Sequence, residues 1–173
     1  MPSALLHPDK ALNLVLESAP APRLERCLLA SALGRALPRP IPCLVDQPPF
    51  DKSSMDGFAY APLAAGMGES YRVVGSSGAA GAAAPPVLRA GECCRVMTGA
   101  PLPEGAAAVQ RIELCELSPD GASLRFTAAE SGSNILRRGS NERAGDTLLS
   151  PRLLSPQDIG ILASSGYAEI EAA

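Results

Sequence analysis

Residues 111–127 read Arg-Ile-Glu-Leu-Cys-Glu-Leu-Ser-Pro-Asp-Gly-Ala-Ser-Leu-Arg-Phe-Thr and give the clearest secondary-structure signal in the 173-residue chain. Two strand-like runs, 111–117 and 123–127, flank Pro119-Asp120-Gly121, which is typical of a tight turn. This pattern predicts a β-hairpin. The whole chain contains 16 glycines and 17 prolines, a composition that favours short strands and turns over long helices.

The sequence on either side extends this pattern into a small all-β unit over about residues 60–132. Further strands are predicted at 71–74 and 93–97, and a loop of glycine, alanine and serine at 75–84. The glycine spacing in this loop matches neither a dinucleotide-binding fingerprint nor a P-loop. Five prolines between residues 38 and 49 predict an extended connector that leads into the β unit.

Helices are predicted near both ends of the chain. Residues 8–19 place proline at the first helical position and apolar residues along one face. Residues 156–165 follow Ser155, a natural N-cap, and Asp158 completes a capping box. Residues 24–37 have helical spacing but are interrupted by glycine, so they are compatible with either a helix or a strand–turn–strand segment. Strands are expected at 147–149 and, beginning after Gly166, in the tail 167–173.

Composition and charge exclude several classes of function. The net charge is −3 and no basic cluster extends beyond Arg137 and Arg138, which argues against nucleic acid as a partner. There is no signal-peptide pattern and no apolar run of membrane-spanning length. Five irregularly spaced cysteines indicate a reduced, cytoplasmic setting, and with His7 as the single histidine a structural zinc site is not expected.

Three polar segments are candidates for a functional site. Residues 51–56 carry two carboxylates and two serines, which could coordinate Mg²⁺ or an oxyanion, or else stabilise a turn. Residues 98–105 could hold an anion with backbone N–H groups and the Thr98 hydroxyl, or form a tight surface loop. In residues 134–141, adjacent arginines could clamp a phosphate, or lie solvated on opposite faces of a strand. The residues alone favour the structural alternative in each case.

Together, four ordered blocks of sequence resemble the molybdopterin molybdotransferase family. Residues 49–59 read Pro-Phe-Asp-x-Ser-x-Met-Asp-Gly-Phe-Ala, and residues 95–106 read Arg-Val-Met-Thr-Gly-Ala-Pro-Leu-Pro-x-Gly-Ala. The third block, within residues 132–146, contains Gly-x-Asn-Ile, Arg-Gly and Ala-Gly-Asp, and the fourth, at 162–166, reads Leu-Ala-Ser-x-Gly. Order and spacing agree with the family pattern from about residue 8 to residue 170.

The resemblance implies an α+β fold with two subdomains. An elongated, discontinuous helix/strand subdomain would comprise residues 1–46 and 133–173, and a compact β-barrel-like subdomain would comprise residues 47–132. The residue pattern of the sequence changes at both junctions, in agreement with this division. The resemblance also implies a dimeric, cytoplasmic protein, and the apolar faces of the two predicted helices favour a homodimer.

The family inserts molybdate into adenylylated molybdopterin in the presence of Mg²⁺, and the product is molybdenum cofactor. The resemblance therefore implies adenylylated molybdopterin and molybdate as substrates, Mg²⁺ as cofactor, and a molybdopterin-adenylating protein as partner. Carried over to this chain, Asp56 and Thr98 are the expected catalytic residues, and Asp56 is the expected metal ligand. Ser53, Gly99 and Arg138 are the expected cofactor-binding residues.

The chain also departs from the family pattern. Asn141 and Ala107 stand where the family usually has acidic residues. The Thr-Gly-Asp-Glu and Gly-Gly-x-Ser motifs of the family's large α/β domain are not found in the sequence. Two hypotheses follow from these departures. The chain is either the amino-terminal half of a molybdotransferase, inactive on its own, or a catalytically degenerate short paralogue that acts as a binding or scaffolding module.

Overall fold

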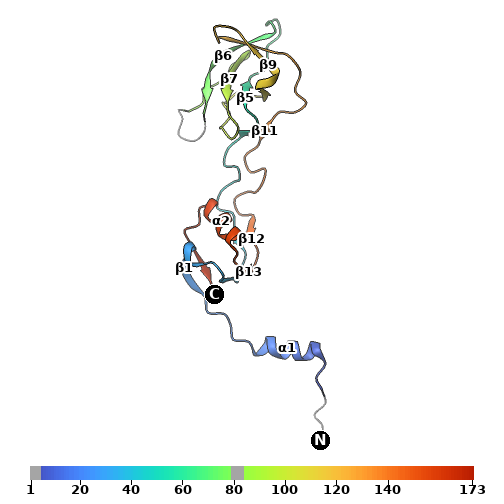
Figure 1. The fold of residues 1–173 in the computed structure, drawn as a ribbon, viewed down its shortest axis with the longest axis vertical. Coiled ribbons are helices and arrows are strands. Elements are labelled where there is room, and N and C mark those ends of the chain that lie inside the picture. Colours follow the sequence, from blue (N-terminus) through green and yellow to red (C-terminus); the bar gives the residue numbers. More distant parts are fainter. Residues whose placement is uncertain (1–4, 79–83) are drawn as a thin grey trace. The chain divides into compact units, whose positions relative to one another are not determined.

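The computed structural model describes residues 5–78 and 84–173 (Figure 1). Its contacts divide the chain into two compact units. Unit 1 comprises Met1–Ile41 and Leu149–Ala173, and unit 2 comprises Pro42–Leu148. The sequence placed the junctions at 46/47 and 132/133. The contacts group residues 42–46 and 133–148 with the β unit, where for example Gln47 forms a β-bridge with Glu142.

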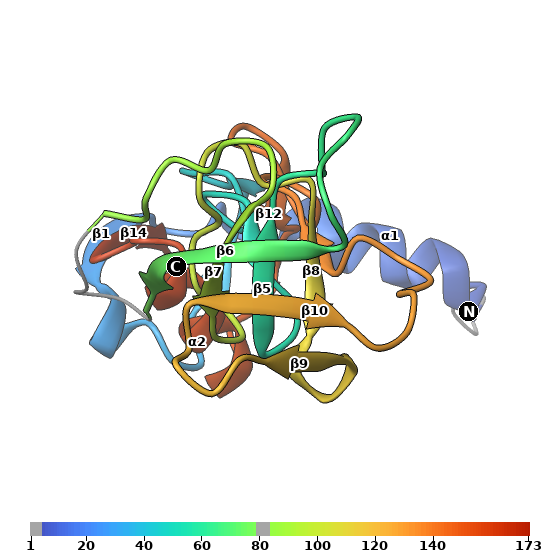
Figure 2. The same ribbon diagram turned by 90° about the horizontal axis from the view of Figure 1, so that it is seen from above.

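Unit 2 is built around a six-stranded sheet in the order β8-β5-β7-β6-β10-β9. Neighbouring strands are antiparallel except β6 and β7, which are parallel. Figure 2 shows that the sheet curls, since β6 and β10 run across the direction of β5 and β8. The strands are β5 (Gly57–Tyr60), β6 (Ser70–Ser77), β7 (Glu92–Val96), β8 (Ala108–Arg111), β9 (Cys115–Leu117) and β10 (Ser123–Phe126).

The predicted hairpin is confirmed only around its turn. β9 and β10 pair antiparallel with Leu117 opposite Leu124, and Gly121 in the turn has a φ of +72° that suits glycine. The first predicted strand is wrong over residues 112–114. Arg111 ends β8, which pairs with β5, and a 3₁₀ helix at Ile112–Leu114 then redirects the chain into β9. The pattern of apolar residues correctly indicated strand structure in this region. Pairing with β5, which is distant in the sequence, determines where the predicted strand is interrupted.

The other two strands predicted in this unit are confirmed with changed limits. β7 matches its prediction closely, while β6 continues through residues expected to form a loop. An irregularity in register between Val73 and Ser76 lets β6 stay beside β7 past Gly75. Residues 79–83 of that predicted loop lie outside the described residues.

The core of unit 2 lies on both faces of the sheet. One cluster contains Phe58 and Cys93, and the other contains their chain neighbours Ala59 and Cys94. This alternation confirms that the adjacent cysteines face opposite ways. Burial raises the pKa of the Cys93 thiol to about 12 and that of Cys94 to about 11.

The chain also forms several short two-stranded pairs. Unit 1 contains antiparallel pairs of β1 with β14 and of β2 with β13, so residues 24–37 form strand, 3₁₀ turn and strand rather than one helix. β4 pairs with β11, and β3 pairs with β12. The strands are β1 (Glu25–Leu28), β2 (Ala36–Leu37), β3 (Ile41–Pro42), β4 (Lys52–Ser53), β11 (Ile135–Leu136), β12 (Thr147–Leu149), β13 (Arg152–Leu153) and β14 (Glu169–Ala172).

Both predicted helices are confirmed, as α1 (Pro8–Ser18) and α2 (Pro156–Ser164). The capping box of α2 is formed, because Ser155 and Asp158 exchange hydrogen bonds between side chain and backbone. Leu162 of α2 is completely buried, whereas no residue of α1 is buried. No helix within the described segments has the length and apolarity needed to cross a membrane.

Candidate functional site

Asp56 and Thr98 lie 42 residues apart in the sequence but meet in the fold. Asp56 directly precedes β5, and Thr98 follows the end of β7. Because β5 and β7 are antiparallel with Gly57 opposite Val96, these two ends lie at the same edge of the sheet. Oδ1 of Asp56 accepts hydrogen bonds from the Thr98 N–H at 2.6 Å and from the Thr98 hydroxyl at 2.7 Å.

These contacts favour the charged form of Asp56. The Thr98 N–H holds the pKa of the Asp56 carboxyl below its usual value, with further contributions from the Thr98 hydroxyl and the nearby positive charge of Arg95. Both Thr98 hydrogen bonds end on Oδ1. Among the described residues no hydrogen bond reaches Oδ2 of Asp56, so this oxygen is available to a ligand or a cation.

Asp56 and Thr98 line a pocket of about 270 Å³ together with Met55, Arg111 and Glu113. We call it the Asp56 pocket. Arg111 enters from β8, where it lies opposite Gly57, and the Ile112 N–H donates to the Asp56 carbonyl at 3.1 Å. Two carboxylates, one hydroxyl and one guanidinium therefore share an open site at the edge of the sheet.

The sequence did not assign a role to Arg111 or Glu113. Each lies in a segment whose apolar pattern indicated only strand, and neither stands beside a recognisable turn motif. The second block of the family resemblance, residues 95–106, ends before both of them. Arg111 forms an ion pair from Nε to Oε2 of Glu130 at 3.0 Å, a partner 19 residues away that sequence spacing does not predict.

Ser53 and Gly99 do not line the Asp56 pocket. The Ser53 side chain is 1% exposed, and its hydroxyl donates to the Met55 carbonyl at 2.5 Å and accepts from the Met55 N–H at 3.2 Å. The Gly99 N–H donates to the Ser53 carbonyl at 2.8 Å. Both residues hold together the two turns that carry Asp56 and Thr98, which matches the turn-stabilising alternative for residues 51–56.

Arg138 is not among the residues that line the Asp56 pocket. Its Nε contacts Oδ2 of Asp46 at 2.6 Å, and its backbone N–H donates to Oδ1 of Asp51 at 2.8 Å. The neighbouring Arg137 contacts Oδ2 of Asp51, also at 2.6 Å. The adjacent arginines thus bind two aspartates of the chain itself.

This network predicts a loss of stability in acid. Hydrogen bonds from the Ala144 N–H and the Arg138 side chain lower the pKa of Asp46, and those from the Arg138 N–H and the Arg137 side chain lower the pKa of Asp51. A carboxyl whose pKa is depressed on folding contributes stability above its unfolded pKa, and loses that contribution as pH falls through its folded pKa. We expect urea unfolding to become easier from about pH 5 towards pH 2.

Asp51→Asn is the matched variant for this measurement. It should be less stable than the unsubstituted chain at pH 7, and the difference should shrink as the pH falls. A difference that stays constant between neutral and acidic pH would contradict the assigned role of Asp51.

The described residues contain no cluster of three or more His, Cys, Asp or Glu side chains suited to a metal ion. The donors of the Asp56 pocket still fit Mg²⁺. This ion commonly binds one or two carboxylates and completes its octahedral shell with water and substrate phosphate. Asp56 and Glu113 can supply those carboxylates, so the pocket suits a cation shared with a ligand rather than one enclosed by protein.

The two departures from the family pattern lie outside this pocket. Asn141 is exposed, and its N–H donates to the Gln47 carbonyl at 2.9 Å. Ala107 is exposed as well, and its N–H donates to the Tyr60 carbonyl. Neither position lines the space between Asp56 and Arg111.

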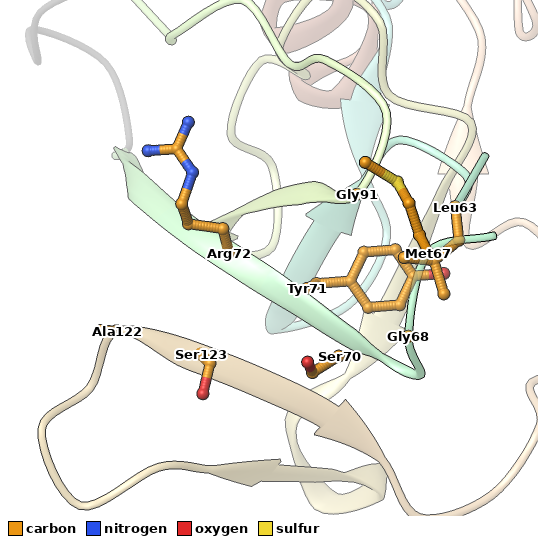
Figure 3. Close-up of a pocket in the computed structure, with 9 residues that line it drawn as sticks. All are labelled: Leu63, Met67, Gly68, Ser70, Tyr71, Arg72, Gly91, Ala122 and Ser123. Atoms are coloured by element: carbon orange, nitrogen blue, oxygen red, sulfur yellow. The ribbon is translucent and has the colours of Figure 1, made fainter.

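A second pocket of about 310 Å³ lies beside β6 and β10 (Figure 3). In Figure 3 the Tyr71 ring points toward Met67 and Leu63, while Arg72, its neighbour on the strand, points away. Arg72 is paired with Glu92, and Tyr71 packs against Phe126 with 4.6 Å between the ring centroids. The groups facing this pocket are mostly apolar, whereas the carboxylates of Asp56 and Glu113 line the Asp56 pocket.

Comparison with known proteins identifies the family. The sequence model described as "MoeA N-terminal region (domain I and II)" matches residues 6–166. Molybdopterin molybdenumtransferase of Haemophilus influenzae is 32% identical over 165 residues, covering 94% of this chain and 41% of the relative. The same-named protein of Staphylococcus aureus strain Mu50 is 32% identical over 149 residues, covering 83% and 35%.

Solved structures agree with this result. A molybdopterin biosynthesis MoeA protein from Pyrococcus horikoshii OT3 superposes with a TM-score of 0.80 at 27% identity, covering 95% of this chain and 45% of that one. A further Pyrococcus MoeA structure gives a TM-score of 0.77 at 28% identity, covering 95% and 43%. The chain belongs to the MoeA amino-terminal family. It spans about two-fifths of the length of the relatives it matches.

Proposed function

We propose that this chain acts in molybdenum cofactor biosynthesis as the amino-terminal part of a molybdopterin molybdotransferase. In this role it supplies one wall of the site at which molybdate is inserted into adenylylated molybdopterin. The observation that carries the proposal is the convergence of Asp56 and Thr98 in one pocket, with Asp56 charged. We infer that the residues of the Asp56 pocket bind the ligand.

Thr98, Asp56 and Glu113 have distinct parts in this proposal. Thr98 uses its N–H and hydroxyl to fix Oδ1 of Asp56, so it orients the carboxylate rather than donating directly to an oxyanion. Oδ2 of Asp56 and the carboxylate of Glu113 would hold the cation that accompanies the ligand. When bound, Mg²⁺ would supply positive charge that offsets the negative charge on the ligand's oxygens. We further propose, from the family resemblance alone, that the protein works in the cytoplasm as a homodimer and that a molybdopterin-adenylating protein supplies its substrate.

Binding of adenylylated molybdopterin to the purified chain tests the proposal. We expect calorimetric titration with Mg²⁺ to show binding that Asp56→Asn weakens about tenfold or more, because a contact to a charged group is lost. The asparagine keeps an oxygen for the two Thr98 hydrogen bonds, so the fold of the pocket is retained. Asp120→Asn is the control, because Asp120 is also a hydrogen-bonded carboxylate but lies in the turn between β9 and β10.

Asp120→Asn should bind like the unsubstituted chain. If the unsubstituted chain fails to bind, or Asp56→Asn binds equally well, the pocket is not the ligand site. The scaffolding alternative would then be the better account of the chain.

A further inference from the structure

The Asp56 pocket lacks the oxyanion donors that its sequence suggested. The Thr98 N–H and hydroxyl both donate to Asp56, and the Gly99 N–H donates to Ser53. A ligand with negatively charged oxygens would therefore meet two carboxylates, from Asp56 and Glu113, and no free donor from the turn at residues 98–99. The compensating donor must come from another wall of the pocket.

Arg111 is the side chain placed to do this. Its Nε donates to Glu130 at 3.0 Å, and among the described residues Nη1 and Nη2 form no hydrogen bond. These two nitrogens carry four N–H groups in one plane, which is the arrangement that suits two oxygens of one anion. The side chain is 44% exposed, so the guanidinium remains accessible while lining the pocket.

Glu130 is built to hold this guanidinium in place. Its side chain is only 10% exposed, and its pKa is lowered by the hydrogen bond to Arg111 and also by one to Asn134. Asn134 is itself fixed, because its Nδ2 donates to the Val109 carbonyl of β8 at 2.9 Å. Glu130 therefore engages the Nε side of the guanidinium, and Nη1 and Nη2 remain for a ligand in the pocket.

We propose that Arg111 is the oxyanion-binding residue of the Asp56 pocket and that Glu130 is its positioning residue. The ligand group is a tetrahedral oxyanion, either the phosphoryl group of a nucleotide or molybdate. Because two carboxylates share the pocket, we expect the anion to bind together with Mg²⁺, whose charge offsets them. The inference rests on the proposed function for the identity of the pocket, but its own residues can be tested separately.

Two calorimetric titrations test Arg111, one with adenosine monophosphate and one with sodium molybdate, each in the presence of Mg²⁺. At least one should bind the unsubstituted chain, and the one that does identifies the source of the oxyanion. Arg111→Gln should weaken that binding about tenfold or more, since a charged hydrogen-bonding group is removed. The anion affinity of Arg111→Lys should lie between those of the unsubstituted chain and Arg111→Gln, because lysine keeps the charge and loses the planar guanidinium. Arg111→Lys also serves as the test if Arg111→Gln does not fold.

Arg125→Gln is the matched control for Arg111. Arg125 forms an ion pair with Glu116 of the same kind, at 2.9 Å, and does not line the Asp56 pocket. Its substitution should leave anion binding unchanged. Absence of binding to either anion, or equal binding by the Arg111 variants and the unsubstituted chain, would overturn the proposal.

A double-mutant cycle tests the positioning role of Glu130. Glu130→Gln should weaken anion binding several-fold when Arg111 is present and should have no further effect in the Arg111→Gln background. Equal weakening in both backgrounds would mean that Glu130 acts on the fold alone. If adenylylated molybdopterin binds in an Asp56-dependent way while Arg111→Gln binds it normally, only the present inference fails. If Arg111-dependent anion binding occurs but the pterin does not bind, only the proposed function fails.

Discussion

Gly57→Ala is expected to destabilise unit 2 by about 3 kcal/mol, because the new methyl group has no space. A Cβ at this position would lie 2.0 Å from the Gln110 carbonyl oxygen and 2.9 Å from its carbonyl carbon. Both atoms belong to the backbone of β8, so no side-chain rotation can relieve the clash. β5 and β8 would have to separate at the end where Arg111 lies opposite Gly57.

Urea denaturation of the variant and of Gly132→Ala would measure this effect. Nothing lies within 4 Å of a Cβ added at Gly132, so that substitution should change the free energy of unfolding by less than about 0.5 kcal/mol. Ligand binding at the Asp56 pocket should fall in Gly57→Ala as well, since the same strand separation displaces Arg111 from Asp56. A Gly57→Ala chain as stable as the Gly132 control would show that β5 and β8 are not packed as described.

Leu162→Ala should destabilise unit 1 by about 3 kcal/mol, the usual cost of removing a fully buried leucine side chain. Leu162 is completely inaccessible on α2, and this helix contacts the 3₁₀ helix at Leu29–Ser31. The truncation leaves a cavity that the neighbouring strands, which are only two to four residues long, can do little to fill.

Amide hydrogen exchange can locate this effect within the chain. Protection should fall in α2, β1 and β14, which belong to unit 1, and should persist in the six-stranded sheet of unit 2. Ile161→Ala is the matched control, because Ile161 neighbours Leu162 on the same helix and is 41% exposed. Loss of protection spread evenly over both units would contradict the division of the chain into two compact units.

Local signals in the sequence predicted those elements that depend on neighbouring residues. The capping box at Ser155 and the turn at Gly121 were predictable because each is decided within a few residues. The break between β8 and β9 was not, since it depends on pairing with β5, some fifty residues earlier in the chain.

The same distinction applies to the candidate site. The meeting of Asp56 and Thr98 followed from the family resemblance, and no spacing rule could have supplied it. Arg111 was missed because its importance comes from the register of three strands and from Glu130, which holds it. Ser53 and Arg138 have side chains that suit a ligand, but the folded chain uses them for internal hydrogen bonds. Residue type alone cannot show whether a polar group binds the protein or a ligand.

The two buried thiols on opposite faces of β7 make the rate of thiol alkylation a measure of how often the sheet opens. Alkylating reagents attack the thiolate, and with pKa values of about 12 for Cys93 and about 11 for Cys94 very little thiolate forms at neutral pH. Both side chains are also wholly inaccessible while the sheet is closed. The rate at which iodoacetamide labels Cys93 and Cys94 therefore measures how often the sheet opens. Each sulfur reports on one of the two faces of the sheet.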